Sequence, residues 1–312
     1  MKKNSGILIG ILVVLVLVLI VELGFLFKDR LATILPDKDP APVTGSTTAP
    51  TTQATTQATT QATTEATTEP TTEATTEPTA PTTAEERAEA TVSAFAAQNG
   101  LSLADYPESL MKLLARNPET EDFVLSYPLE KDMEHTVDLS GMDLSKVPLF
   151  LQWDKRWGYT IYGNDVAGLT ACGPTALSMA AYYLTGGDPK MTPDKIIQFA
   201  LDNGYCAPGN GSYWSLIYQG GEDLGLDVWE IDKGYASVKE ELEGGHVIIC
   251  LVGPGAFTTD GHFIVIAGMD SDGKLIINDS NSRTRSEKTW DYYEIYDQID
   301  TMWTLCGHDY VG

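Results

Sequence analysis

The sequence predicts an α+β fold for residues 147–312, preceded by a transmembrane helix, a disordered stalk and a short helical segment. Three observations lead to this prediction. The composition of the 312-residue chain changes sharply along its length. Helical patterns dominate residues 172–244, and short segments rich in Val and Ile, separated by glycine-containing turns, follow them. Helices that precede an antiparallel sheet are typical of the α+β class.

Residues 1–30 have the pattern of a membrane anchor. Lys2 and Lys3 precede an apolar run from Gly6 to Val21, which resumes one residue later. A helix of about 20 such residues spans the apolar core of a bilayer. A cleavable secretory signal is the alternative, but its apolar part is usually about 7 to 15 residues long. We therefore expect a single-pass anchor in the cell membrane.

Residues 31–83 are rich in Thr and Pro, and Thr51–Pro78 repeats a four-residue unit such as Thr-Thr-Gln-Ala or Thr-Thr-Glu-Pro. A tract without large apolar side chains cannot offset the loss of chain entropy, which predicts a disordered stalk. Stalks of this composition suit proteins of the bacterial cell surface. We therefore expect the rest of the chain to be extracellular.

The formal net charge of −24 argues against nucleic acid as a partner, because affinity for phosphate backbones depends on clustered Lys and Arg. The four cysteines do not make a disulfide scaffold in so long a chain, and no Cys-x-x-Cys pair occurs. Cys206 and Cys306 are either free or paired with each other. Because the four histidines are scattered, no metal site and no cofactor are expected.

Residues 84–146, here called the helical preface, are expected to hold three short helices before about Tyr127. Asn117 is the candidate N-cap of the third helix, Pro118 fits its first turn, and Pro128 is expected just beyond its end. A unit this small is marginal alone, so its apolar residues are expected to pack on the following domain. A pro-segment that covers the functional site is the alternative.

The first long helix of the main domain is expected to begin at Cys172 or Gly173 and to end near Leu184, before Gly186. Three more helices are expected, starting at Thr192, near Trp214, and at Ser237, where Ser237 and Glu240 form a capping box. Strands are expected at His246–Val252, His262–Ala267 and Lys274–Asn278.

Cys172 is the candidate nucleophile. Its predicted place at a helix N-terminus offers unpaired N–H groups and the positive end of the helix dipole, which stabilise a thiolate. Gly173 beside it leaves space for a substrate backbone. A buried structural cysteine is the alternative, and Cys250, within an apolar run, is expected to be one.

His262 is the candidate base, since it follows Gly261 and opens a predicted strand. If residues 270–273 turn the chain into the next strand, Asp279 lies opposite His262, where its carboxylate can accept the imidazole Nδ1–H. Asn278 faces the other side in this register, although a one-residue bulge would exchange the two. Asp279 is thus the expected orienting residue.

Gln152 is the candidate side-chain donor to an oxyanion, acting together with the backbone N–H of the nucleophile. Neighbouring aromatic residues would fix its side chain. An exposed polar loop residue is the alternative.

Four motifs in this order resemble bacterial cysteine peptidase family 39, which has a papain-like fold and includes the bacteriocin-processing double-glycine peptidases. They are Gln152–Trp157 with Tyr162-Gly163, Ala171–Thr175, Gly261–Gly268 and Ile277–Asp279. The resemblance covers roughly residues 147–306. It implies the same roles for Cys172, His262, Asp279 and Gln152.

The chain differs from the family pattern in two ways. Gln152 lies farther from the cysteine than in transporter-linked members, and Ser280 stands where the family usually has Pro. The expected protein is a surface-tethered cysteine peptidase, a thiol hydrolase that acts on peptides or proteins through an acyl-enzyme. The alternatives are a hydrolase of peptidoglycan stem peptides in the cell wall and a non-catalytic binding module on a stalk.

Overall fold

The computed structural model describes residues 83–207, 209 and 211–308. The predicted anchor, residues 1–30, and the predicted stalk up to residue 82 lie outside the described residues. All the described residues belong to one compact unit. Within these ranges no helix is both long enough and apolar enough to cross a bilayer.

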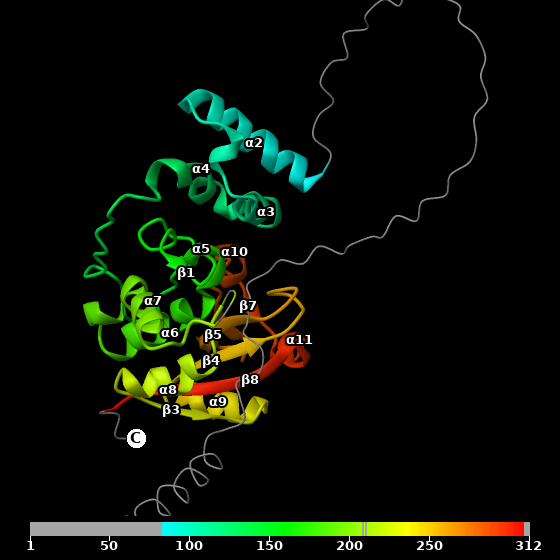
Figure 1. Cartoon of the computed structure of the whole chain (residues 1–312). Helices are drawn as coiled ribbons and strands as arrows, with labels where there is room; N and C mark the ends of the chain where they lie inside the picture. Colours follow the sequence, from blue (N-terminus) through cyan, green and yellow to red (C-terminus); the bar gives the residue numbers. More distant parts are fainter. Residues whose placement is uncertain (1–82, 208, 210, 309–312) are drawn as a thin grey trace, which may run out of the picture. The chain divides into compact units, whose positions relative to one another are not determined.

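A six-stranded antiparallel sheet, in the order β3-β8-β4-β5-β6-β7, lies at the centre of the domain (Figure 1). The strands are β3 Leu226–Glu230, β4 Val247–Val252, β5 His262–Met269, β6 Leu275–Asn278, β7 Thr289–Trp290 and β8 Ile299–Gly307. A separate hairpin joins β1 Ile161–Tyr162 to β2 Asp165–Val166. The predicted α+β class is confirmed, and the three predicted strands are β4, β5 and β6.

Helices precede and flank this sheet (Figure 1). Those of the main domain are α5 Ala167–Thr170, α6 Cys172–Leu184, α7 Pro193–Asp202, α8 Ser215–Asp223, α9 Tyr235–Glu243, α10 Arg283–Ser286 and α11 Tyr292–Ile295. All six residues of β4 are buried, as expected for an apolar run covered on both faces. Val247, Ile249 and Leu251 belong to the hydrophobic cluster of α6–α8. The alternate residues belong to the cluster that contains residues of α9 and α11.

Helix α6 begins and ends where the sequence predicts. Pro174 fits its first turn, and Gly186, with a φ of 67°, stops the chain from continuing as a helix. Every residue from Cys172 to Tyr182 is buried, and the helix packs against β5. The fold therefore fixes the N-terminus of α6 near the start of β5.

Two predicted helix ends are wrong. Ser237 does not cap α9, because the helix already begins at Tyr235, whose ring packs 5.6 Å from that of Tyr292 and whose hydroxyl donates to Gly273 O. Pro128 lies inside α4, Glu121–Glu130, rather than beyond it. Near a C-terminus a proline removes only one helical bond, and Lys131 N still donates to Tyr127 O.

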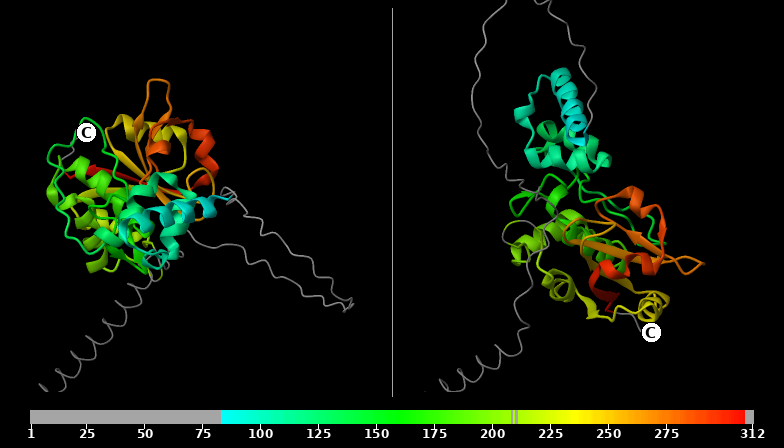
Figure 2. Two further views of the ribbon diagram at one scale, coloured as in Figure 1. Left: turned by 90° about the horizontal axis from the view of Figure 1, so that it is seen from above. Right: turned by 90° about the vertical axis from the view of Figure 1, so that its right-hand side faces the viewer.

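The helical preface consists of α2 Ala84–Asn99, α3 Glu108–Arg116 and α4, linked by two 3₁₀ turns, Leu103–Asp105 and Pro118–Thr120. Its apolar residues share a cluster with Tyr159, Val166 and Leu169 of the main domain, beside which Figure 2 shows the three helices. The Phe123 ring stacks on Tyr159 at 4.6 Å, and a Cβ on Gly168 would meet that ring at 2.5 Å. The preface thus packs on the main domain, as predicted.

Candidate active site

Cys172 and His262 meet where the N-terminus of α6 faces the start of β5. The Cys172 side chain hydrogen-bonds to the His262 imidazole. Both residues are buried, with 1% and 4% of their surfaces exposed. The first N–H groups of a helix have no partner inside the helix, so Cys172 Sγ also lies close to backbone donors and to the positive end of the α6 dipole. The structure brings together the predicted nucleophile and base.

Asp279 completes a chain of three side chains. Its Oδ1 lies 2.8 Å from His262 Nε2, which leaves His262 Nδ1 for the thiol. The predicted contact through Nδ1 is therefore wrong in its choice of nitrogen. Asp279 comes after the last residue of β6, and from there its carboxylate reaches the distal nitrogen of the ring.

The register of β5 and β6 also differs from the predicted one. Val265 pairs with Asn278, and the register shifts between Ile266 and Gly268. Extending this pairing by one residue puts Ile264 opposite Asp279, so the contact with His262 is diagonal. Asn278 instead binds the backbone at the start of the main domain, where its Nδ2 donates to Val147 O at 3.0 Å and to Pro148 O at 3.1 Å.

The Asp279 carboxylate is fully buried and has a donor on each oxygen. Arg285 Nε donates to Oδ2 at 2.5 Å, and the backbone N–H of Asn281 donates to Oδ1 at 2.8 Å. Burial alone would raise the pKa of this carboxyl group. The charges and hydrogen bonds of His262 and Arg285 outweigh burial and lower the pKa of Asp279. The carboxylate is thus ionised at neutral pH.

The same contacts favour a charged imidazole. Burial lowers the pKa of His262, but the charge and hydrogen bond of Asp279, followed by the interactions with Cys172, outweigh it and raise the pKa to about 10. An imidazolium beside a thiol favours the thiolate form of the sulfur. The structure therefore holds a charged imidazole, oriented by Asp279, beside the Cys172 thiol.

Gln152 is buried, with 3% of its surface exposed, and both ends of its amide are bonded. Its Nε2 donates to Gly168 O at 3.0 Å, while its Oε1 accepts from Ser280 Oγ at 2.9 Å. A carbonyl oxygen can only accept, which fixes the orientation of the amide. The second N–H of Nε2 is then available to a ligand.

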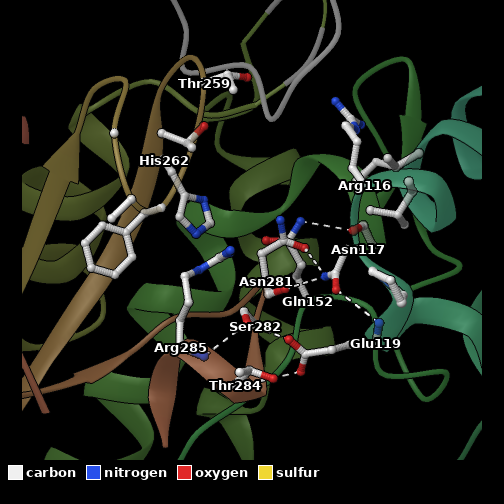
Figure 3. Close-up of a pocket in the computed structure, with 18 residues that line it drawn as sticks. Arg116, Asn117, Glu119, Gln152, Thr259, His262, Asn281, Ser282, Thr284 and Arg285 are labelled. Carbon is white, nitrogen blue, oxygen red and sulfur yellow. Dashed lines mark hydrogen bonds between the residues drawn. The ribbon is translucent and has the colours of Figure 1, made fainter. Parts of the chain in front are cut away.

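A cleft of about 640 Å³ opens over these side chains. Its described lining includes His262 and Gln152 from the main domain, together with Arg116, Asn117 and Glu119 from the helical preface (Figure 3). Cys172, which is buried beside His262, is not among the described lining residues. The preface provides one side of the cleft, a role that the sequence did not predict.

Two residues hold the preface against the segment that carries Asp279. Asn117 Nδ2 donates to Asn281 O at 2.7 Å. The Glu119 carboxylate accepts from Ser282 Oγ at 2.6 Å and from the backbone N–H groups of residues 283 and 284 at 2.9 and 3.2 Å (Figure 3). Burial raises the pKa of Glu119, but these donors outweigh it and lower the pKa. The charged Glu119 side chain therefore links the helical preface to the segment that follows Asp279.

Sequence reasoning missed Arg285 and noted Ser280 only as a departure from the family pattern. A signal for Arg285 was present: in a chain of net charge −24, two arginines follow the candidate aspartate within six residues. Ser280 gave no such signal, because its hydroxyl bonds to a residue that is distant in the sequence.

The described residues include no group of three or more His, Cys, Asp or Glu side chains placed to hold a metal ion. All four cysteines of the chain are free thiols in the structure. Cys250 is fully buried within β4, in agreement with its predicted role in the core. Cys206 and Cys306 therefore do not pair with each other.

The chain belongs to the Peptidase_C39 like family, whose model matches residues 144–309, more than half of its length. Among solved structures, it is similar to the peptidase domain of Streptococcus ComA, which is described as a bi-functional ABC transporter involved in a quorum sensing pathway. That similarity has a TM-score of 0.35 and 18% identity, and it covers 52% of this chain and 98% of the ComA domain. No curated protein matches the chain.

Proposed function

We propose that this protein is a cysteine peptidase in which Cys172 is the nucleophile, His262 the base, Asp279 the orienting residue and Gln152 the oxyanion donor. One observation supports the proposal most strongly: a thiol at the N-terminus of a buried helix bonds to an imidazole whose other nitrogen bonds to a buried carboxylate. Nucleophile, base and orienting group are the three parts that covalent catalysis by a thiol requires.

In the first step Cys172 Sγ attacks the carbonyl carbon of a peptide bond and a C–S bond forms. The carbonyl oxygen gains negative charge, which the free N–H of Gln152 Nε2 and the Cys172 backbone N–H stabilise. His262 gives its Nδ1 proton to the leaving nitrogen as the C–N bond breaks. An amine leaves, and a thioester on Cys172 remains.

In the second step water attacks the thioester carbon, and His262 Nδ1 takes a proton from it. The C–S bond breaks, a carboxylic acid leaves, and the Cys172–His262 ion pair returns. Asp279 holds the imidazole through Nε2 in both steps, while Arg285 keeps the carboxylate ionised. The proposed hydrolysis therefore uses these side chains, the Cys172 backbone N–H and water.

The proposed location is the outer face of the cell membrane, with residues 1–30 as anchor and residues 31–83 as stalk. The apolar run and the Thr- and Pro-rich repeats of the sequence support it. The proposed substrates are peptides or proteins outside the cell, cell-wall stem peptides among them.

The proposal is tested by alkylation of the full chain with iodoacetamide, with each cysteine followed by mass spectrometry. We expect Cys172 to react stoichiometrically and at least about 10-fold faster than the half-buried Cys206, because a thiolate is the reactive form. The rate at Cys172 should fall to that of an ordinary thiol in His262→Ala. Equal rates at Cys172 in both proteins would exclude the ion pair and favour a non-catalytic binding module.

Turnover is measured in parallel on casein, on quenched fluorescent peptides and on purified cell-wall material. Cys172→Ser should abolish any cleavage, while Cys206→Ser should leave it unchanged. Release of wall fragments without cleavage of casein or the free peptides would assign the activity to stem peptides.

A further inference from the structure

The charges of the active-site cleft are neutralised by protein contacts, with one exception. Arg285 is paired with Asp279, and the Glu119 carboxylate is satisfied by three donors of the segment from Ser282 to residue 284. His262 is paired with Asp279. The ion pairs between the described side chains include none with Arg116, which also lines the cleft.

The position of Arg116 is fixed on both sides. Its Nε donates to Lys112 O at 3.1 Å, one helical turn back in α3. The next residue, Asn117, is bound to Asn281 O at 2.7 Å, two residues beyond Asp279. Figure 3 shows Arg116 on the wall across from His262. Arg116 is an exposed residue of this lining, and its guanidinium thus presents a positive charge to whatever occupies the cleft.

A guanidinium is a strong and geometrically specific partner for a carboxylate. A negative charge on a ligand would be attracted to this site, although the chain as a whole carries a net charge of −24. The surroundings do not compete for Arg116, because Glu119, the single carboxylate among the described lining residues, is held by its own donors.

We infer that Arg116 is a specificity residue which selects substrates bearing a carboxylate. The helical preface then binds this carboxylate, while the main domain cleaves the peptide bond. The inference rests on the proposed peptidase function and adds a substrate class to it. The carboxylate is either an Asp or Glu side chain near the cleaved bond or the C-terminal carboxylate of the peptide.

The test uses quenched fluorescent peptides on a Gly/Ala/Leu background, in which each position in turn is Glu, Gln or Lys, with the C-terminus either free or amidated. The wild-type protein should cleave the best Glu peptide, or the free-acid form, about 10-fold faster in kcat/KM than its neutral counterpart, the size expected for a charge-assisted hydrogen bond in a partly exposed cleft. Arg116→Ala should bring this ratio to about 1, and Arg116→Glu should favour the Lys peptides. A preference for Glu would show that Arg116 binds a side-chain carboxylate of the substrate. A preference for the free acid would show that it binds the C-terminal carboxylate.

Lys112→Ala is the matched control, since Lys112 is a cation of the same helix that pairs with Glu108 and does not line the cleft. It should keep the wild-type ratio.

To separate the inference from the proposed activity, fluorescein-labelled forms of the same peptides are titrated into Cys172→Ala and into Cys172→Ala/Arg116→Ala, with anisotropy as the readout. If the peptides with a carboxylate bind more tightly and Arg116→Ala removes that preference, the role of Arg116 is supported. If the wild-type protein also cleaves none of the peptides, the proposed peptidase activity is contradicted. Cleavage or binding without any charge preference, or a preference that survives Arg116→Ala, would overturn the role of Arg116.

Discussion

Arg285 donates to Oδ2 of Asp279 at 2.5 Å, the oxygen that His262 leaves open. The carboxylate is fully buried, whereas 28% of the arginine side chain is exposed. Arg285 therefore supplies a second positive partner to an ionised group that has no access to water. Without it, the charge of Asp279 depends on His262 and one backbone donor.

Arg285→Ala should lower the free energy of unfolding at pH 7 by about 1–3 kcal/mol, less than for a fully buried pair because the arginine is partly exposed. The pKa of Asp279 is lower in the folded protein than in the unfolded chain, where it is about 4, so the ionised carboxylate stabilises the fold above that pH. This stabilisation is lost as the pH falls through the pKa of the folded protein. The difference between the two proteins should thus shrink below about pH 4. Urea unfolding at several pH values measures it. Arg283→Ala, at an exposed arginine two residues earlier, is the control, and an equal loss there would contradict the role given to Arg285.

The imidazole of His262 should titrate far above an ordinary histidine in ¹⁵N NMR spectra, since its pKa is raised to about 10. Asp279→Asn should lower that pKa more than Cys172→Ala does, because Asp279 makes the larger contribution. In the proposed mechanism a protonated His262 is the acid for the leaving amine, so kcat/KM should hold across neutral pH and fall as the pH rises through the raised pKa of His262. An ordinary pKa in the wild-type protein would exclude the ion pair.

Gln152→Ala should reduce kcat by about 10²- to 10³-fold with little change in KM, because an oxyanion donor acts mainly in the transition state. Ser280→Ala removes only the hydrogen bond that orients the amide, at 2.9 Å. A loss of about 5-fold in kcat is expected, equivalent to about 1 kcal/mol. A rise in KM alone for Gln152→Ala would show that the side chain binds the substrate and does not stabilise the oxyanion.

Gly168→Ala should cost about 1–3 kcal/mol of stability, since the new Cβ would lie 2.5 Å from the Phe123 ring. Phe123→Ala should cost about 3–5 kcal/mol by itself. In the double variant the clash is absent, so the sum of the single losses should exceed the measured loss by about 1 kcal/mol or more. Gly141→Ala, where a Cβ meets nothing within 4 Å, should be neutral. Strict additivity would mean that the preface and the main domain do not pack as described.

Local signals predicted the parts of the site that depend on local structure. Pro174 and Gly186 gave the limits of α6 and so placed Cys172 at a helix N-terminus. His262 and Asp279 were recognised as partners, although the register between their strands and the contacting nitrogen were wrong. A side chain beyond the end of a strand can reach a diagonal neighbour, which strand alternation alone does not reveal.

The contacts that sequence reasoning missed join distant segments. Strand β8 pairs with β3 and β4, which lie far before it in the chain, and no local pattern specifies that pairing. The same holds for Glu119, whose carboxylate binds residues more than 160 positions away. Its neighbours Asn117 and Pro118 predicted a helix start, but the contacts of Glu119 itself depend on the folded chain.

The contacts of Asn117 and Glu119 also mean that the proposed catalytic residues and the inferred specificity residue, Arg116, occupy separate stretches of this chain. The family match begins at residue 144, so it contains Cys172, His262 and Asp279, the proposed catalytic residues, but none of the preface residues that line the cleft. An exchange of residues 84–130 between related proteins would therefore replace one wall of the cleft and leave the chemistry intact. Under the proposed function, new substrate preferences would evolve through a neighbouring segment, without change to the proposed catalytic residues.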